Sequence, residues 1–149
     1  MLAARKALVR MYLIDTMVIS EHRKGSKANP GVRQFFKDTI ENKQPLFISV
    51  VTVGEIRRGI ENLRHKQDKP GANKLEKWLG DVVSEYAQQI LPFDLDMAQV
   101  WGSLLVPNPQ HSDDKKIAAT ALIHDLTLVT RNVDDFRPVA DLRLLNPFT

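Results

Sequence analysis

The sequence predicts an α/β domain in which a mostly parallel central sheet is flanked by helices on both faces. Two observations favour this fold class. Short apolar runs alternate with longer stretches whose apolar residues recur at helical spacing, which is typical of strand–helix–strand units. The chain has 149 residues, of which 43% are hydrophobic, and it contains no internal repeat, so one domain with one core is expected.

Five short apolar runs are predicted to form the strands of this sheet. The runs cover residues 11–14, 46–50, 90–93, 126–130 and 142–145. Because parallel strands need a crossover of about a dozen or more residues, the stretches between the runs are expected to contain the helices.

Helical spacing is found in those intervening stretches. Apolar residues recur every three or four positions after Thr16. They do so again over residues 32–40, 56–63, 75–86, 98–105 and 117–122. Asp94 or Asp96 is expected to start the fourth of these five stretches, and Ser112 the fifth. The segment 65–73 contains a Pro-Gly pair and is predicted to be a loop.

Composition excludes several kinds of site. The chain has no cysteine, which removes disulfides, thiolate ligands and cysteine nucleophiles, so a metal would have to be held by oxygen or histidine. No apolar run approaches the roughly 18 residues of a membrane span, and no apolar stretch of a secretory signal follows the basic N-terminus. We therefore expect a cytoplasmic protein without a membrane partner. Residues 1–10 are expected to be a disordered extension before a domain over 11–149, with Met11 as an alternative start.

The net charge of +3 is unevenly distributed along the chain. Residues 1–10 carry three basic and no acidic residues, and residues 57–77 carry seven basic and three acidic residues, which leaves the remainder at −4. A basic segment beside an acidic remainder fits a protein that holds a polyanion near a carboxylate-bound metal. For any single lysine of this segment, a solvated helical face is the simpler explanation.

Four acidic residues are predicted to meet at one edge of the sheet. Asp15 directly follows the first strand, and Asp135 follows the strand over 126–130. Glu55 and Asp114 lie near the starts of two helices. Since ligands of an open parallel sheet bind at the carboxyl ends of its strands, these side chains are expected to converge. Carboxylates suit a hard cation such as Mg²⁺ or Mn²⁺, which can bridge phosphates and activate water.

Three of these acids also have a structural explanation. Thr52 and Glu55 have the T-x-x-E spacing of a capping box, which closes a helix N-terminus. The helix dipole favours Asp114 in a first turn, and Asp135 could stabilise a turn through its side chain. Asp15, which adjoins an apolar strand, has no such local explanation.

Four sequence blocks carry a more specific pattern. They are YLIDT..IS at 12–20, SVVTVGEI at 49–56, D..IAATA at 114–121 and L.LVTRN..DF at 126–136. Because these four blocks occur together, the chain resembles the PIN-domain ribonucleases, and most of all the VapC-type toxins of toxin–antitoxin modules. The resemblance extends from about Met11 to Pro147. The resemblance implies a three-layer PIN-like fold and an endoribonuclease that depends on Mg²⁺ or Mn²⁺. It also implies that four acids are catalytic residues and metal ligands: Asp15, Glu55, Asp114 and Asp135.

The resemblance also suggests supporting residues. Thr16, Thr130 and Asn132 match positions beside the acidic site, where they would orient carboxylates or water. Met17 stands where many relatives have asparagine, so an apolar side chain replaces one polar contact near the metal. Five basic residues are candidate contacts for RNA phosphates: Arg57, Arg58, Lys115, Lys116 and Arg131. The four histidines lack the spacing of metal ligands and are assigned no role at the site.

Partners follow from the resemblance as well. RNA is the expected substrate, and a VapB-like antitoxin, whose C-terminal segment wraps the toxin, is expected to hold the enzyme inactive. The family further implies a homodimer and a larger hetero-oligomer with the antitoxin.

Two other functions remain open from the residues alone. An aspartyl phosphotransferase would use Asp15 as a phosphate acceptor, although the sequence Asp15-Thr16-Met17 lacks the D-x-D signature of haloacid-dehalogenase-like enzymes. A non-catalytic module would use an acidic pocket to bind a basic partner.

Overall fold

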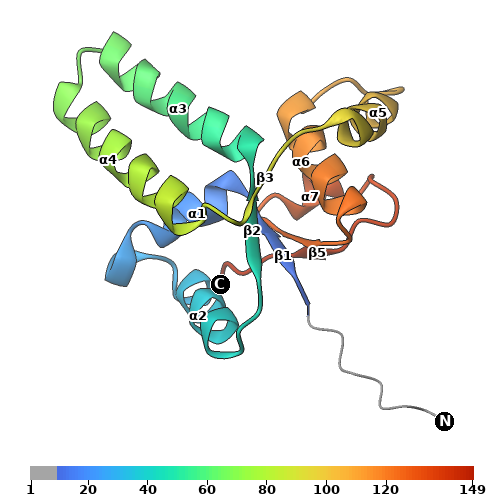
Figure 1. Ribbon diagram of the computed structural model, residues 1–149, viewed down its shortest axis with the longest axis horizontal. Helices are drawn as coiled ribbons and strands as arrows, with labels where there is room; N and C mark the ends of the chain where they lie inside the picture. Colours follow the sequence, from blue (N-terminus) through green and yellow to red (C-terminus); the bar gives the residue numbers. More distant parts are fainter. Residues whose placement is uncertain (1–9) are drawn as a thin grey trace.

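In the computed structural model of the protein, residues 10–149 are described (Figure 1). Over these residues the chain forms a five-stranded sheet, seven α-helices and one short 3-10 helix. In chain order the elements are β1 (Tyr12–Ile14), α1 (Thr16–His22), η1 (Gly25–Lys27), α2 (Pro30–Glu41), β2 (Leu46–Ser49), α3 (Val50–His65), α4 (Lys69–Glu85), β3 (Ile90–Leu91), α5 (Leu95–Leu104), α6 (Ser112–Ile123), β4 (Thr127–Val129), α7 (Val133–Phe136) and β5 (Leu144–Leu145). The predicted N-terminal extension lies outside the described residues except for Arg10.

The sheet has the strand order β3-β2-β1-β4-β5, and every neighbouring pair is parallel. This arrangement confirms the predicted fold class and all five predicted strands. The central strand is β1, in which Leu13 lies opposite Phe47 of β2 on one side and Leu128 of β4 on the other. The carboxyl end of β1 therefore lies in the middle of one edge of the sheet.

Both faces of β1 are covered, which explains why its sequence is apolar without alternation. Tyr12 and Ile14 pack on one face in a cluster with residues of α1, α2 and α4, such as Phe36. Leu13 packs on the opposite face with residues of α6 and α7, such as Ile117. The strand is thus held rigidly between two helical layers, and the residue that follows it is placed with little freedom.

Helices α3 and α4 form an antiparallel hairpin that projects from the sheet, and α5, α6 and α7 lie on the other side of the molecule (Figure 1). We call this hairpin the arm. Ile60 and Leu79 belong to a separate apolar cluster along its length. Among residues 10–149, no helix combines the length and the apolar character needed to cross a bilayer.

The predicted loop over 65–73 is wrong, because only residues 66–68 separate α3 from α4. Asp68 caps α4 by accepting a hydrogen bond from the Gly71 backbone N–H at 3.0 Å. Pro70 lies in the first turn of that helix, where its missing N–H would have had no helical partner. A side chain at position 71 would collide with the Asp68 carboxylate, so the Pro-Gly pair belongs to a helix start.

The alternative explanation of Thr52 and Glu55 as a capping box is excluded. Helix α3 begins at Val50, and Ser49 is its cap, with the side-chain oxygen accepting a hydrogen bond from the Val51 backbone N–H at 3.0 Å. Glu55 therefore lies in the second turn and is not needed to close the helix. The expected starts of two other helices are confirmed: Asp94 caps α5 by accepting from the Met97 N–H at 3.1 Å, and Ser112 is the first residue of α6.

Candidate metal centre

Asp15 lies at the carboxyl end of β1 and is 4% exposed. Its Oδ1 atom accepts a hydrogen bond from the Thr16 backbone N–H at 2.8 Å, and its Oδ2 atom accepts one from the Thr130 hydroxyl at 2.7 Å. Asp15 is also the N-cap of α1, since that helix begins at the next residue. This local role corrects the prediction that Asp15 has no structural function.

Thr130 approaches Asp15 from the end of β4, and the Asn132 backbone contacts Thr130. The Asp15 backbone N–H donates to the Val129 carbonyl at 3.0 Å, which fixes the two strand ends side by side. Thr130 is fully buried, and its hydroxyl oxygen accepts a hydrogen bond from the Asn132 backbone N–H at 3.0 Å. The Thr130 hydroxyl is therefore aimed at the Asp15 carboxylate by a partner of its own.

Glu55 reaches the same edge from the second turn of α3. The Thr16 hydroxyl donates to Glu55 Oε1 at 2.9 Å, and the hydroxyl oxygens of Thr16 and Thr52 are also 2.9 Å apart. Thr16 thus connects the N-terminus of α1, where Asp15 lies, with the start of the arm. Met17, at 41% exposure, makes the neighbouring position apolar.

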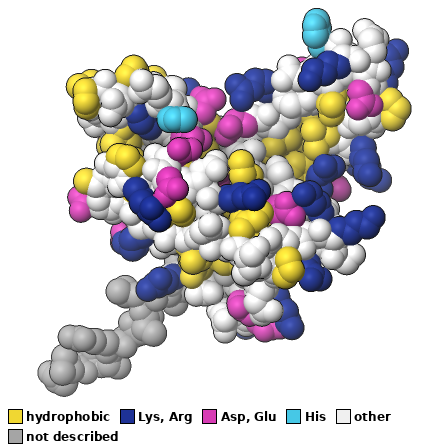
Figure 2. All heavy atoms as spheres, turned by 180° about the vertical axis from the view of Figure 1, so that it is seen from behind, with side chains coloured by type: hydrophobic (Ala, Val, Ile, Leu, Met, Phe, Trp, Pro, Cys, Tyr) yellow, Lys and Arg dark blue, Asp and Glu magenta, His cyan; other side chains and the backbone are white. Residues whose placement is uncertain are grey.

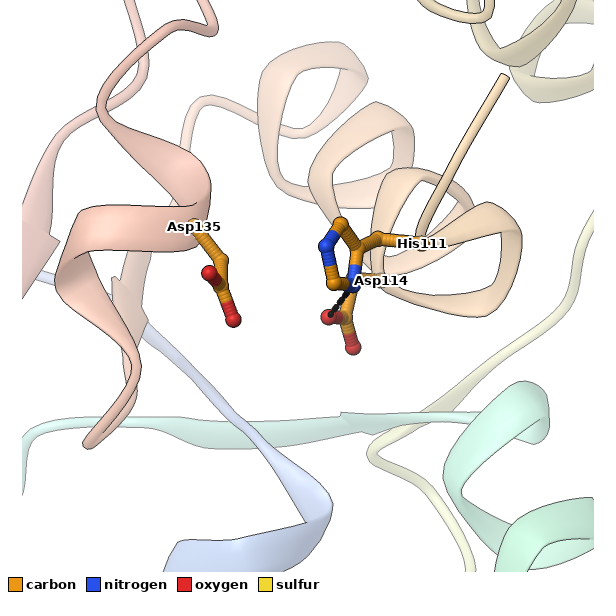
Figure 3. Close-up of side chains that lie close together, drawn as sticks. All are labelled: His111, Asp114 and Asp135. Atoms are coloured by element: carbon orange, nitrogen blue, oxygen red, sulfur yellow. Dashed lines mark ion pairs between the residues drawn. The ribbon is translucent and has the colours of Figure 1, made fainter. Parts of the chain in front are cut away.

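A separate group of side chains, from the start of α6 and from α7, lies close together (Figure 3). Among the described residues, one set of His, Asp or Glu side chains offers ligand atoms that all lie within 4.8 Å of one another, and it consists of His111, Asp114 and Asp135. The His111 Nδ1 atom is 3.9 Å from Asp114 Oδ2. Asp15 and Glu55 lie outside this set.

His111 was missed by sequence reasoning. It is the N-cap residue of α6, in the left-handed region at φ 56° and ψ 47°, and it makes no side-chain hydrogen bond to the helix end. The available signal was its position three residues before Asp114, because side chains at this spacing near a helix start lie on one side of the helix.

Burial raises the pKa of three of the four carboxyls, and like charges add to this effect at two of them. Burial raises the pKa of Asp15, and the hydrogen bonds from Thr130 and Thr16 only partly offset this. Burial also raises the pKa of Glu55, and the Asp15 carboxylate adds to the effect. For Asp114, burial is again the first cause of a raised pKa, followed by the charge of Asp15. These acids therefore share one electrostatic field, although their contacts form two groups.

The acidic edge is accessible from solvent. A cavity of about 220 Å³ is lined by Val51, Gly54, Glu55, Arg58, Asp113 and Lys116. A larger cavity of about 560 Å³, between the loop that precedes α6 and the region of α7, is lined by residues that include His111, Lys115 and Asp135. In Figure 2, two parts of the molecule project upwards with a hollow between them. Acidic side chains gather below this hollow, and basic side chains lie beside them.

The five candidate RNA contacts differ in their surroundings. Arg57 is bound to Glu76 on the arm, and the Lys115 ammonium donates to the Asn108 carbonyl. The Arg131 guanidinium lies 4.9 Å from the centre of the Phe148 ring. The other two, Arg58 and Lys116, line the smaller cavity together with Glu55. Three of the five candidates therefore share a cavity with a carboxylate of the site: Arg58 and Lys116 with Glu55, and Lys115 with Asp135.

Comparison with known proteins identifies relatives that cover almost the whole chain. The family model described as PIN domain matches residues 12–142. VapC ribonuclease Y4jK of Sinorhizobium fredii is 31% identical over 144 residues, which cover 93% of this chain and 98% of the relative. Toxin FitB of Neisseria gonorrhoeae is 32% identical over 144 residues, which cover 93% of this chain and 99% of the relative.

Solved structures show the same architecture. The crystal structure of FitAcB from Neisseria gonorrhoeae contains a chain that matches with a TM-score of 0.75 and 31% identity, covering 92% of this chain and 98% of that one. VapBC2 from Rickettsia felis, solved with a DNA fragment from its promoter, matches with a TM-score of 0.70, covering 91% and 98%. At 21% identity, this second likeness concerns the fold alone.

Proposed function

The chain belongs to the PIN-domain family, and on this basis we propose that it is a metal-dependent endoribonuclease that acts as the toxin of a toxin–antitoxin pair. The observation that carries the proposal is the placement of four acids from distant parts of the chain at one sheet edge: Asp15, Glu55, Asp114 and Asp135. Relatives named a VapC ribonuclease and a toxin, each matched over 93% of this chain, support the same activity.

The donor set fits a divalent cation. Asp114 and Asp135 offer carboxylate oxygens within 4.8 Å of each other, and Asp15 adds negative charge from the sheet side. Mg²⁺ or Mn²⁺ held there would activate water and neutralise the phosphodiester during hydrolysis of the bond to the 3′ oxygen. Its charge would also offset burial and the like charge of Asp15, which together raise the pKa of Asp114.

The chain's own residues have separate tasks in this proposal. Asp15 is fixed by two hydrogen bonds and cannot swing away from the edge, so it holds the negative charge at a constant position. Glu55 is oriented by the Thr16 hydroxyl and faces the smaller cavity. Arg58 and Lys116 line that cavity and would hold a phosphate of the RNA backbone there. Arg57 is engaged by Glu76 and is a poorer candidate.

Lys115 and Arg131 remain weaker candidates for RNA contacts. Lys115 lines the larger cavity beside Asp135, so RNA that leaves the cleavage site on that side would pass it. Arg131 lies between Thr130 and Asn132 in sequence, and its guanidinium packs 4.9 Å from the centre of the Phe148 ring.

We further propose that a VapB-like antitoxin binds this chain, that two copies form a homodimer, and that the two proteins assemble into a larger hetero-oligomer. The FitAcB and VapBC2 structures support this part of the proposal, since they are toxin–antitoxin complexes of the same fold. We also propose that the protein acts in the cytoplasm, where it would meet an RNA substrate.

An aspartyl phosphotransferase is disfavoured by the surroundings of Asp15. A phosphate acceptor needs an accessible carboxylate oxygen, whereas Asp15 is 4% exposed and both of its oxygens accept hydrogen bonds. The experiment below also tests the other alternative, a non-catalytic module whose acidic pocket binds a basic partner.

The test is cleavage of a panel of RNAs by the purified protein with EDTA, Mg²⁺ or Mn²⁺. We expect cleavage only with a divalent ion, and none by an Asp114→Asn variant. Expression of the protein alone should arrest growth, and co-expression of the small protein encoded beside it should relieve the arrest. Full cleavage after EDTA treatment would contradict the metal mechanism, and metal binding without cleavage of any RNA would favour the binding module.

A further inference from the structure

The geometry points to His111 as a nitrogen ligand of the metal centre, which makes the centre select first-row transition ions such as Mn²⁺ over Mg²⁺. The inference rests on the proposed function only in assuming that the acidic edge binds a metal. His111 is a surface residue by its 57% side-chain exposure, yet its ring faces two carboxylates from two different elements (Figure 3).

The distances are close to those of a shared ion. Two ligand atoms that each lie about 2.0 to 2.2 Å from one ion are at most about 4.4 Å apart. The His111 Nδ1 to Asp114 Oδ2 distance of 3.9 Å falls within this limit, and the whole set lies within 4.8 Å. A movement of a few tenths of an ångström would therefore bring all three atoms onto one ion. The side chains are half-buried or exposed, so such a movement costs little.

The ring of His111 has no other evident task in the helix. It is the N-cap residue of α6, but its side chain does not hydrogen-bond the helix end. Its backbone occupies the left-handed region, which L-residues other than Asn, Asp and His adopt rarely. This backbone conformation directs the ring towards Asp114 rather than along the helix. The larger cavity, which His111 and Asp135 both line, gives an ion a path to them.

A nitrogen ligand changes which ion is favoured. Mg²⁺ prefers oxygen ligands and releases water reluctantly, whereas imidazole binds transition ions well. Two carboxylates with one imidazole therefore form a mixed nitrogen and oxygen site. Such a site should bind Mn²⁺ more tightly, relative to Mg²⁺, than the carboxylates alone would.

Mn²⁺ itself is the probe for the test. Pulsed electron paramagnetic resonance of Mn²⁺ added to the full chain should show nitrogen coupling from an imidazole, and histidine labelled with ¹⁵N should change that coupling. We compare His111→Asn, which tolerates the left-handed backbone and removes the imidazole, with His111→Gly, which tolerates it without any side chain. The matched control is His124→Asn, because His124 is the C-cap residue at the other end of the same helix.

The nitrogen coupling should disappear in both His111 variants and persist in the His124 variant. In calorimetric titrations the Mn²⁺ to Mg²⁺ affinity ratio should fall by roughly tenfold or more in the His111 variants, since even groups that only support a ligand affect metal affinity by that much. Mn²⁺ binding without nitrogen coupling in the wild type would overturn the role of His111 and leave the proposed nuclease intact. An absence of Mn²⁺ binding, together with an absence of cleavage, would overturn both.

Discussion

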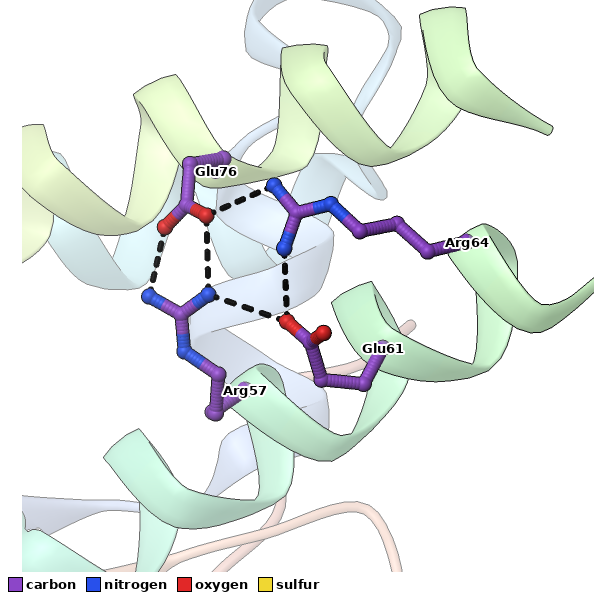
Figure 4. Close-up of polar contacts among 4 residues, drawn as sticks. All are labelled: Arg57, Glu61, Arg64 and Glu76. Atoms are coloured by element: carbon purple, nitrogen blue, oxygen red, sulfur yellow. Dashed lines mark hydrogen bonds and ion pairs between the residues drawn. The ribbon is translucent and has the colours of Figure 1, made fainter. Parts of the chain in front are cut away.

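Two clusters of charge on the helix α3 behave in opposite ways. At its start, Glu55 faces the carboxylates of the metal centre, and burial and like charges raise its pKa. Along the arm, Glu76 of α4 accepts hydrogen bonds from Arg57 and Arg64, which lower its pKa from 4.5 to about 2 (Figure 4). The same type of side chain is therefore disfavoured as an anion at the start of α3 and favoured on the arm, where Glu76 contacts Arg57.

The arrangement of opposite charges explains the difference. On the arm, Arg57 and Arg64 each contact Glu61 and Glu76, so cations and anions alternate across the two helices (Figure 4). At the metal centre, carboxylates face one another across the sheet edge. On the arm, the arginine charges neutralise the glutamate charges. The sheet edge carries negative charge that a bound cation would neutralise. Two arginines of the basic segment that was predicted to bind a polyanion, Arg57 and Arg64, therefore form ion pairs within the protein.

Replacing Asp15 by asparagine should have the largest effect. Asparagine is an equally good N-cap and can still pair with Thr130, so the local structure is kept while the charge is lost. RNA cleavage should fall by at least roughly 100-fold, as for the loss of a fixed electrostatic group in an active site. Because the folded-state pKa of Asp15 is raised, its ionised form destabilises the metal-free fold at neutral pH, and the variant should melt at a higher temperature after EDTA treatment.

Calorimetric melting with and without Mn²⁺ checks both parts. The wild type should gain stability on adding the ion, and Asp15→Asn should gain less. If the metal-free variant were markedly less stable than the metal-free wild type, the main role of Asp15 would be to stabilise the fold.

Glu55→Gln should have the next largest effect. Glutamine retains an oxygen that accepts the Thr16 hydroxyl, but it removes the negative charge, so cleavage should fall by roughly 10- to 100-fold. Metal-free stability should be unchanged or higher, because the variant removes a half-buried charge that also lies near the Asp15 carboxylate. Cleavage assays at fixed Mg²⁺ and thermal melting measure the two effects.

The control for Glu55 is Ser49→Ala, since Ser49 is the residue that caps α3. Loss of this cap should cost about 0.5 to 2 kcal/mol of stability while the carboxylates stay in place. Cleavage by the folded control should remain near that of the wild type. If Glu55→Gln cuts RNA as fast as the wild type, Glu55 has no part in catalysis.

The sheet could be predicted because its strands are short, buried on both faces and separated by helical stretches. Leu13 and Ile14, both fully buried, show why the first strand appears in the sequence as an uninterrupted apolar run. Once the strands are parallel, their carboxyl ends share one edge, and this is why acids far apart in the sequence, such as Asp15 and Asp135, were predicted to converge. These predictions depended on patterns repeated over many residues.

Single helix starts were harder to predict, because neighbouring residues compete for the same role. Both Ser49 and Thr52 are good caps, and the choice depends on the end of β2, where Ser49 pairs with Leu91 of another strand. Asp68 was overlooked for a similar reason, since the Pro-Gly pair after it suggested a loop. The position of His111 depends on one left-handed backbone conformation, which no periodic pattern reveals.

Thr130→Val should have a smaller effect on cleavage than either acid. The change keeps the shape of the side chain but leaves Asp15 Oδ2 and the Asn132 N–H without this partner, which should cost about 1 to 3 kcal/mol of stability. Cleavage should fall by roughly tenfold, because the carboxylate is held less firmly. Urea unfolding and initial rates measure these effects, with Thr130→Ser, which keeps the hydroxyl, as the control. If both variants lost stability and cleavage equally, the effect would come from packing and not from the hydroxyl.

Glu76→Gln should have the smallest effect and should act on stability alone. Arg57 and Arg64 would each lose a charged partner on the exposed arm, so the melting temperature should fall by less than in Thr130→Val while RNA cleavage stays unchanged. A fall in cleavage at unchanged melting temperature would mean that the arm positions RNA. Arg58→Gln is the matched comparison, because Arg58 lies on the same helix but lines the cavity with Glu55, and its loss should weaken RNA binding.

The pH dependence of Glu76→Gln separates the arm from the metal centre. Glu76 has a pKa of about 2 in the folded protein against an ordinary value of 4.5, so its ionised form stabilises the fold. This contribution is present above pH 4.5 and is lost as the pH falls towards 2. The difference in melting temperature between wild type and variant should therefore shrink with falling pH in that window. For Asp15→Asn the raised pKa has the opposite sign: the ionised carboxylate destabilises the metal-free fold, so the advantage of the variant should grow as the pH rises above 3.8. The melting temperature of the wild type minus that of the variant should therefore rise with pH for Glu76→Gln and fall with pH for metal-free Asp15→Asn. A change in the same direction for both would contradict the contrast between the two charge clusters.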